Sequence, residues 1–161
     1  MQRRLTNHSS RRLRRGLTQG VRAHVKHPAP TQQEIAEVEA AVGHSLPPEL
    51  LESYANRGNG GFGPDYGLLG LASGHATDQA DTALSLFRLF GQPDPDDPGW
   101  DWPDHLLPIL HLGCAIYYCV DLSTPGNPVV QFDPNGFGPG DKWDGAFSVV
   151  FPKLEPWLRG L

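Results

Sequence analysis

The sequence has no run of about eighteen apolar residues, so it predicts no membrane-spanning helix. It also has no apolar segment of the kind that forms the core of a signal peptide. Cysteine is scarce, because Cys114 and Cys119 are the only two, and both fall in a segment that we expect to form a strand. Residues at that spacing in a strand point to opposite faces, so we expect no disulfide between them. These absences predict a soluble, cytoplasmic protein.

Motifs for common catalytic chemistry are missing as well. There is no G-x-S-x-G for a serine nucleophile and no G-x-x-x-x-G-K-[ST] for a bound phosphate. The glycine-rich segment 58–63 lacks the lysine and the hydroxyl of a phosphate-binding loop, so we interpret it as a turn. Cys114 or Cys119 with His111 would give a nucleophile and a base, but cysteines packed in strands are far commoner. We therefore predict that the protein is not an enzyme and has no small-molecule substrate.

Metal ligands at useful spacing are also absent. The closest histidine pairs, His24 with His27 and His105 with His111, have no cysteine or acid at zinc-finger or H-E-x-x-H spacing. Residues 94–97 are rich in aspartate but lack the mid-loop glycine and the terminal glutamate of an EF-hand. The sequence predicts no metal and no cofactor, and a solvated acidic loop at 94–97.

Charge is distributed very unevenly along the chain. Residues 1–26 hold eight of the thirteen lysines and arginines and no acidic residue. Residues 27–161 hold five basic and eighteen acidic side chains, a formal balance of −13. An acidic body discourages direct binding of nucleic acid and attracts basic proteins, mainly by speeding their association.

The basic arm, residues 1–27, leaves three interpretations open. Four apolar residues recur in it at four-residue spacing: Leu13, Leu17, Val21 and Val25. This spacing permits a leading helix over residues 13–26, while a disordered arm, or a segment upstream of the natural start, fits the composition. An anchor for nucleic acid or membrane is less favoured, because no aromatic residue lies among the arginines to stack on bases or enter lipid.

The strongest local signals lie at the start of the acidic body. Thr31 followed by Glu34 is a capping box, which predicts a helix that begins at Gln32 and ends at Gly43. Pro48 suits the first turn of a second helix. The residues that we expect these two helices to bury are Ile35, Val38, Val42, Leu50, Leu51 and Tyr54.

The rest of the chain predicts an α+β fold, in which N-terminal helices pack on a mainly antiparallel sheet and a C-terminal helix closes the domain. We expect a strand at 66–71, a helix at 82–90 with Asp78 or Asp81 as its N-cap and Gly91 as its end, and irregular chain at 92–104. Further strands are expected at 106–112, 115–122 and 128–132, a loop at 133–141, and a last helix from Pro152 to Gly160. Residues 146–151 fit either a strand or a helix.

Several of these motifs together resemble the SUKH superfamily, the Smi/Knr-like domains. They are Leu46-Pro47-Pro48, Asn59-Gly60-Gly61-Phe62-Gly63, Tyr66 to Leu71, Trp102-Pro103-Asp104, Leu107-Pro108-Ile109, Tyr117-Tyr118-Cys119-Val120-Asp121 and Pro128-Val129-Val130. The resemblance covers residues 28–161, which we interpret as one domain. Where the family commonly has a Gly-Asp pair before the aromatic strand, this chain has Ala115-Ile116, so the role of that acid is not carried over.

The resemblance implies a non-enzymatic protein-binding domain. Bacterial members are widely immunity proteins that neutralise a toxin, often a basic nuclease, and fungal members are regulatory interaction modules. Tryptophans in the aspartate-rich loop are either lids over the core or anchors for a partner. The candidate partner-binding residues are Phe62, Asp65, Tyr66, Asp94, Asp96, Asp97, Trp100, Asp101, Trp102 and Asp104.

Overall fold

The computed structural model describes residues 25–161, and residues 1–24 lie outside the described part. The leading helix predicted over residues 13–26, and most of the basic arm with it, therefore falls outside the described residues. Residues 25–30 have no regular structure. The Asn59 N–H donates to the carbonyl of Pro28 (3.0 Å), which ties the start of the body to the glycine-rich turn.

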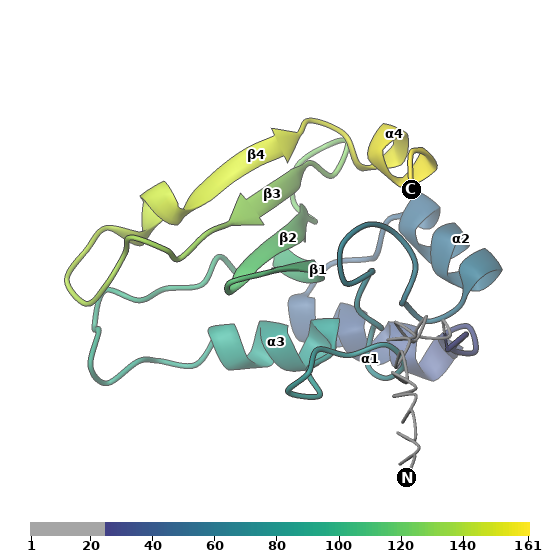
Figure 1. Ribbon diagram of the computed structural model, residues 1–161, viewed down its shortest axis with the longest axis horizontal. Helices are drawn as coiled ribbons and strands as arrows, with labels where there is room; N and C mark the ends of the chain where they lie inside the picture. The colour runs from purple at the N-terminus through teal and green to yellow at the C-terminus, as the bar shows by residue number, and fades with distance from the viewer. Residues whose placement is uncertain (1–24) are drawn as a thin grey trace, which may run out of the picture.

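The described residues form the predicted α+β fold. Three helices come first: α1 (Gln32–Val42), α2 (Pro48–Arg57) and α3 (Ala83–Phe90). An antiparallel sheet follows, with strands β1 (Leu106–Gly113), β2 (Ile116–Asp121), β3 (Val129–Phe132) and β4 (Phe147–Phe151) side by side in that order. The 3₁₀ helix η1 (Trp143–Ala146) precedes β4, and α4 (Leu154–Arg159) follows it. In Figure 1, α3 lies under the sheet with α1 beside it, while α2 and α4 lie together at the right-hand end.

The capping box at the start of α1 is confirmed. Thr31 Oγ1 accepts a hydrogen bond from the Glu34 N–H (3.2 Å), and Glu34 Oε2 accepts one from the Thr31 N–H (2.8 Å). Gly43 ends the helix in the left-handed conformation, with φ at 71°. Both ends of α1 therefore lie where the sequence places them, and α2 begins at Pro48 as predicted.

The predicted N-cap of α3 is wrong, although its end at Gly91 is confirmed. Thr82, not Asp78 or Asp81, caps the helix: its Oγ1 accepts from the Ser85 N–H (3.4 Å), and Ser85 Oγ accepts from the Thr82 N–H (2.8 Å). Thr82 immediately precedes the first helical residue, so its hydroxyl can reach the free N–H groups of the first turn. The Asp81 carboxylate accepts from the Ser85 hydroxyl instead (3.1 Å).

Residues 66–71 do not form the predicted strand. A single bridge, between Leu68 and Leu110, and one hydrogen bond, from the Leu69 N–H to the Ile109 carbonyl (2.8 Å), join this segment to β1. The segment covers the outer edge of the sheet without extending it by a full strand.

The glycine-rich turn makes further hydrogen bonds with that segment. The Gly61 N–H donates to the Leu68 carbonyl (2.7 Å), and the Leu71 N–H donates to the side-chain oxygen of Asn59 (2.9 Å). Gly60 makes this approach possible, because a Cβ at its position would lie 2.5 Å from the Leu68 carbonyl oxygen. The alternation of apolar residues in 66–71 thus reflects burial against the turn rather than strand pairing.

The β1–β2 hairpin is confirmed, but Cys114 belongs to its turn and not to a strand. Cys114 and Ala115 both have positive φ (51° and 60°), and β2 begins at the next residue. Cys114 is exposed, Cys119 is buried in β2, and both are free thiols.

Residues 146–151 fitted either a strand or a helix, and the structure shows the strand: β4 begins at Phe147. The last helix begins later than predicted, at Leu154 instead of Pro152. Lys153 is extended (φ −142°), and the Leu154 N–H donates to the carbonyl of Gly126 (3.0 Å), so the chain turns into the helix only after Lys153.

Helix α2 gives a direct test of the core. Leu50 is fully buried in it, so Leu50→Ala should lower the free energy of unfolding by about 2–5 kcal/mol in a urea titration. Leu89→Ala is the matched control, because Leu89 on α3 is 56% exposed and its loss should change that free energy by no more than about 0.5 kcal/mol. A Leu50→Ala cost as small as the control would place α2 outside the core.

Candidate functional site

Two loops far apart in the sequence meet at one end of the molecule, the left-hand end in Figure 1. They are residues 92–104, between α3 and β1, and residues 133–146, between β3 and β4. The carboxylate of Asp97 joins them: Oδ2 accepts from the Trp143 indole N–H (2.6 Å) and Oδ1 from the Gly140 N–H (3.3 Å). In its own loop, Asp97 Oδ1 also accepts from the Gly99 N–H (3.1 Å).

Asp97 is buried, at 2% exposed, and its carboxylate is held as an anion. The hydrogen bond from Trp143 lowers the pKa of this carboxyl below its usual value, burial opposes that shift, and the Gly140 and Gly99 amides add to it. A carboxylate that accepts three N–H bonds is better satisfied ionised than protonated. Asp97 therefore works as a structural link between the loops rather than as a free surface charge.

Aromatic rings support the same junction. Trp100 packs edge-to-face against Trp143 with ring centroids 4.8 Å apart, and Phe137 stacks on Trp143 at 5.8 Å. The Trp100 indole N–H donates to the carbonyl of Phe90 at the end of α3 (2.8 Å). Pairs of this geometry contribute about 0.5–1.5 kcal/mol each beyond their buried area, so the two loops form one packed unit.

We call residues 92–101 and 133–146 the acidic lobe. It contains seven aspartates and a single basic residue, Lys142. Five of the aspartates are exposed: Asp94, Asp96, Asp101, Asp141 and Asp144. Two of these carboxylates also accept local bonds: Asp94 Oδ1 from the Asp96 N–H (2.9 Å) and Asp141 Oδ2 from the Gly138 N–H (2.8 Å). The lobe thus presents a negative surface on a braced scaffold.

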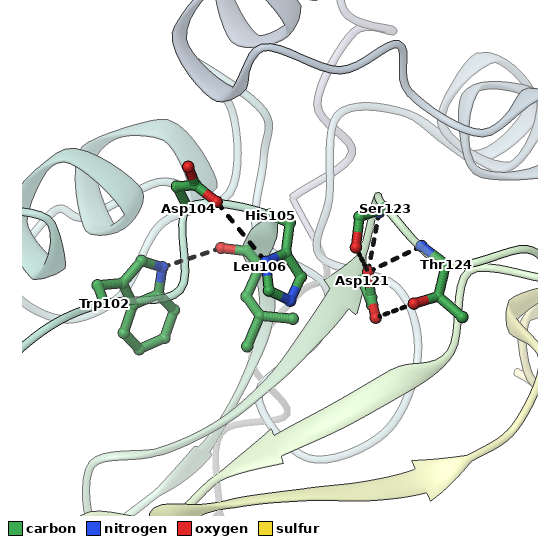
Figure 2. A network of polar contacts seen from close by, with 7 residues as sticks. All are labelled: Trp102, Asp104, His105, Leu106, Asp121, Ser123 and Thr124. Atoms are coloured by element: carbon green, nitrogen blue, oxygen red, sulfur yellow. Dashed lines mark hydrogen bonds and ion pairs between the residues drawn. The ribbon is translucent and has the colours of Figure 1, made fainter. Parts of the chain in front are cut away.

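The end of the first loop leaves the acidic lobe. Trp102 is 5% exposed, and its indole N–H donates to the Leu106 carbonyl (3.0 Å), as Figure 2 shows. Asp104 has a side chain that is 98% exposed and lies 3.6 Å from His105 Nδ1. It precedes β1, whereas residues 133–146 follow β3, which runs in the same direction. Asp104 therefore lies at the end of the sheet opposite to the lobe, and Trp102 lies in the core.

Asp121 occupies that opposite end, beside His105. Its carboxylate accepts from the backbone N–H and hydroxyl of Ser123 (both 2.8 Å) and from those of Thr124 (3.1 and 2.7 Å) (Figure 2). Partial burial would raise the pKa of Asp121, but the bonds from Thr124 and Ser123 outweigh it and hold the pKa low. This carboxylate builds the turn after β2.

The other three candidates do not gather at one place. Phe62 packs against Tyr54 (5.7 Å between centroids) and under the guanidinium of Arg57 (4.3 Å). Both partners belong to α2, which lies at the end of the molecule away from the lobe (Figure 1). Tyr66, 60% exposed, stacks on His111 of β1 (5.4 Å). Asp65 is exposed beside it.

The β1–β2 turn just beyond His111 touches the acidic lobe, because the carbonyl of Cys114 accepts from the side-chain amide of Asn135 (3.0 Å). Of these three candidates, Tyr66 is thus the one whose ring stacks on the hairpin that borders the lobe.

The second half of the lobe was not predicted from the sequence. Asp141, Trp143 and Asp144 were not candidates, because residues 133–141 were expected only to be a loop. The one available signal was their composition, which repeats the glycine, proline and aspartate of residues 92–104. Nothing local in either segment shows that one packs on the other.

Nucleophilic chemistry has little support in the described residues. Cys119 is fully buried, and burial raises the pKa of its thiol, which keeps it protonated and unreactive. His111 lies between the rings of Tyr66 and Tyr117 (5.4 and 4.8 Å). Within residues 25–161, no three side chains gather in a way that could hold a metal ion. In the same range, every helix is too short or too polar to cross a bilayer.

In the comparison with protein families, residues 29–160 match the model of the SMI1 / KNR4 family (SUKH-1). Comparison with curated proteins and with solved structures gives no match.

The link through Asp97 predicts a specific pH dependence. Folding lowers the pKa of this carboxyl, so its stabilising contribution is complete above the unfolded value of about 3.9 and is lost as the pH falls below it. Asp97→Asn should therefore lower the free energy of unfolding at pH 7, and the difference from the wild type should shrink between about pH 4 and pH 2. Urea titrations at several pH values measure it.

Asp96→Asn is the matched control for this series, since its side chain is exposed one residue away. It should change the unfolding free energy little at any pH. Trp143→Phe keeps an aromatic ring, although a smaller one, and removes the donor to Asp97, so it should reproduce the effect of Asp97→Asn in part. A loss in Asp97→Asn that is the same at pH 3 and pH 7 would contradict an ionised link.

The two thiols should differ in reactivity. Iodoacetamide at pH 8 should alkylate Cys114 rapidly and leave Cys119 unmodified until the protein unfolds, because burial raises the pKa of Cys119 and blocks access. Mass spectrometry should find one alkyl group on the native wild type and none on Cys114→Ser. Rapid native alkylation of Cys114→Ser would revive a nucleophilic role for Cys119.

Proposed function

The chain belongs to the SMI1 / KNR4 family (SUKH-1), and from this premise we propose that it is a non-enzymatic immunity protein that neutralises a toxin by binding it. The family supports a domain for immunity or for protein interaction. The finer proposal, a basic toxin domain such as a nuclease, comes from the charge of the acidic lobe, which is the observation that carries it.

The charge of the body favours a basic partner. Residues 25–161 contain eighteen acidic and six basic side chains, and two of the basic ones, Arg88 and Arg159, pair with Glu37 and Glu155. Within the lobe, Lys142 is the only basic residue among seven aspartates. An electrostatic potential of one sign over a surface speeds association with an oppositely charged partner and disfavours binding of partners with like charge. The same field disfavours direct binding of nucleic acid or of an anionic membrane.

The proposed mechanism is occlusion. A toxin that acts on nucleic acid needs a basic surface to bind its substrate, and the exposed aspartates of the lobe would cover that surface. The bonds of Asp97 and the packing of Trp100 on Trp143 hold the two loops before a partner arrives. Preorganised loops lose less entropy on binding, which favours tight complexes.

Of the predicted contact residues, three are the main candidates: Asp94, Asp96 and Asp101, which are exposed in the lobe. Trp100 is half-buried in the same loop, and Tyr66 stacks on the neighbouring hairpin. Asp97 and Trp102 would support this surface from inside, and Phe62, Asp65 and Asp104 would take part only if the partner extends beyond the lobe.

The alternative is a regulatory interaction module without a toxin partner, which the family supports as well. A gene for a secreted toxin beside the gene for this protein favours immunity, and its absence favours the regulatory role. Because the toxin would act inside the cell that carries the immunity protein, we propose a cytoplasmic location, no cofactor and no small-molecule substrate.

Charge reversal in the lobe tests the proposal. The triple variant Asp94→Lys, Asp96→Lys and Asp101→Lys should slow association with the toxin domain encoded by the adjacent gene at least about tenfold at 0.05 M salt. The difference should shrink at 0.5 M salt, where charges are screened over a few ångströms. Stopped-flow association rates and co-purification measure it.

The matched control changes the total charge by the same amount at other sites: Glu49→Lys, Glu52→Lys and Asp78→Lys. Glu49 and Glu52 are on α2, at the end away from the lobe, and Asp78 is in the loop before α3. This variant should slow association far less than the lobe variant. Equal effects of the two variants, or binding indifferent to both salt and Asp96→Lys, would contradict occlusion by the lobe.

A further inference from the structure

The sheet has one covered edge and one open edge. Residues 68 and 69 cover the edge at β1, through the bridge to Leu110 and the bond to Ile109. At the other edge, β4 pairs with β3 and with no other strand of residues 25–161. Its outer backbone groups are therefore available to a further strand.

β4 lacks two of the features that protect an open edge, namely charged side chains and proline. Proteins usually place charges or proline in an edge strand so that other chains cannot pair with it. The sequence of β4, Phe-Ser-Val-Val-Phe, contains neither, and Val149 in its middle is 62% exposed. The one protective irregularity in its pairing with β3 is a register shift that leaves Val150 without a partner on β3. Five uncharged residues, four of which have high strand propensity, are well suited to pair with an extended segment.

An apolar groove of about 630 Å³ lies at the end of this strand. It is lined mainly by side chains of β4 and of the chain around α4: Phe151, Pro152, Pro156, Trp157 and Leu161, together with Pro64. Trp157 stacks on Phe151 (5.8 Å), which fixes one wall. Lys153 is the only charged residue in the lining, and it makes no ion pair within the described part of the chain.

The two features lie on opposite faces of β4. Val149 lies opposite Val130, and Phe151 lies opposite Val129, so the two side chains point to different faces of the sheet. A strand added at the open edge alternates its side chains in the same way. One set would pack beside Val149, and the other would enter the groove beside Phe151.

Charge decides between possible occupants. A second copy of the chain is disfavoured by like charge. Its residues 25–161 contain twelve more acidic than basic side chains, and its own Lys153 would lie next to this edge. The chain's own basic arm has no acidic residue in 1–26 to meet Lys153. An extended segment with alternating apolar residues and a carboxylate at one end fits all three features. Its backbone would pair with β4, its apolar side chains would fill the groove, and its carboxylate would pair with Lys153.

We propose that the open edge of β4 binds such a segment of a partner protein by strand addition, with alternate apolar side chains in the groove and a carboxylate on Lys153. The recognition mode is one in which main-chain bonds supply affinity and side-chain pockets supply specificity. This surface is separate from the acidic lobe, and the proposal does not rest on the proposed function.

A selection from a displayed library of random twelve-residue peptides on the full chain tests it. Enriched peptides should show alternating apolar residues followed by Asp or Glu. Synthetic versions should bind the wild type at least about tenfold more tightly than Val149→Asp and Lys153→Glu. Leu89→Asp is the matched control, because Leu89 is a similarly exposed apolar residue on α3 (56%), and it should leave binding unchanged. Urea titration checks that each variant is folded.

Backbone methylation separates strand addition from side-chain binding alone. In an antiparallel pair, alternate residues of the added strand direct their N–H toward the edge. N-methylation of the residues whose N–H points toward β4 should abolish binding. N-methylation of the residues between them should leave binding unchanged. The proposal is overturned if no peptide distinguishes wild type from Val149→Asp, if both methylated sets bind equally, or if the enriched peptides are basic and lose binding with Asp96→Lys. A dimer of the chain that Val149→Asp dissociates would make a second copy the occupant and would also overturn it.

Discussion

The buried carboxylate of Asp97 is the interaction on which the surface at one end of this domain depends. Two loops without regular structure come together there, and loops of this length are normally mobile because few of their backbone groups are paired. Asp97 accepts bonds from both loops, and its bond to Trp143 spans 46 residues of sequence. The two loops that this buried charge joins carry five exposed aspartates.

The fold follows from sequence where the signal is local. The capping box of Thr31 and Glu34 involves residues three apart, so the start of α1 could be predicted to the residue. The cap of α3 was misplaced because three neighbouring residues, Asp78, Asp81 and Thr82, all have side chains that can cap, and only their position relative to Ala83 decides. Residues 66–71 alternate like a strand, yet the glycine-rich turn competes with β1 for their hydrogen bonds.

One of the two loops of the candidate site could be predicted from the sequence, because its signal is also local. An acidic loop at 92–104 could be identified from composition, as could its two tryptophans, but not that Trp102 enters the core while Trp100 stays at the junction. The partner loop, 133–146, contributes Trp143 and two exposed aspartates through contacts that only the folded sheet brings together. Asp104 shows the opposite case. It is close in sequence to the lobe residue Asp101, yet it lies at the other end of the sheet, where β1 begins.

We propose that this domain works by presenting surfaces to protein partners, with the acidic lobe as the central one. The most direct measurement is amide hydrogen exchange over the whole chain, with and without a bound toxin domain from the adjacent gene. The account predicts that binding slows exchange in residues 92–101 and 133–146 and leaves α2 unchanged. Slower exchange confined to other parts of the chain, with the lobe exchanging as in the free protein, would contradict it.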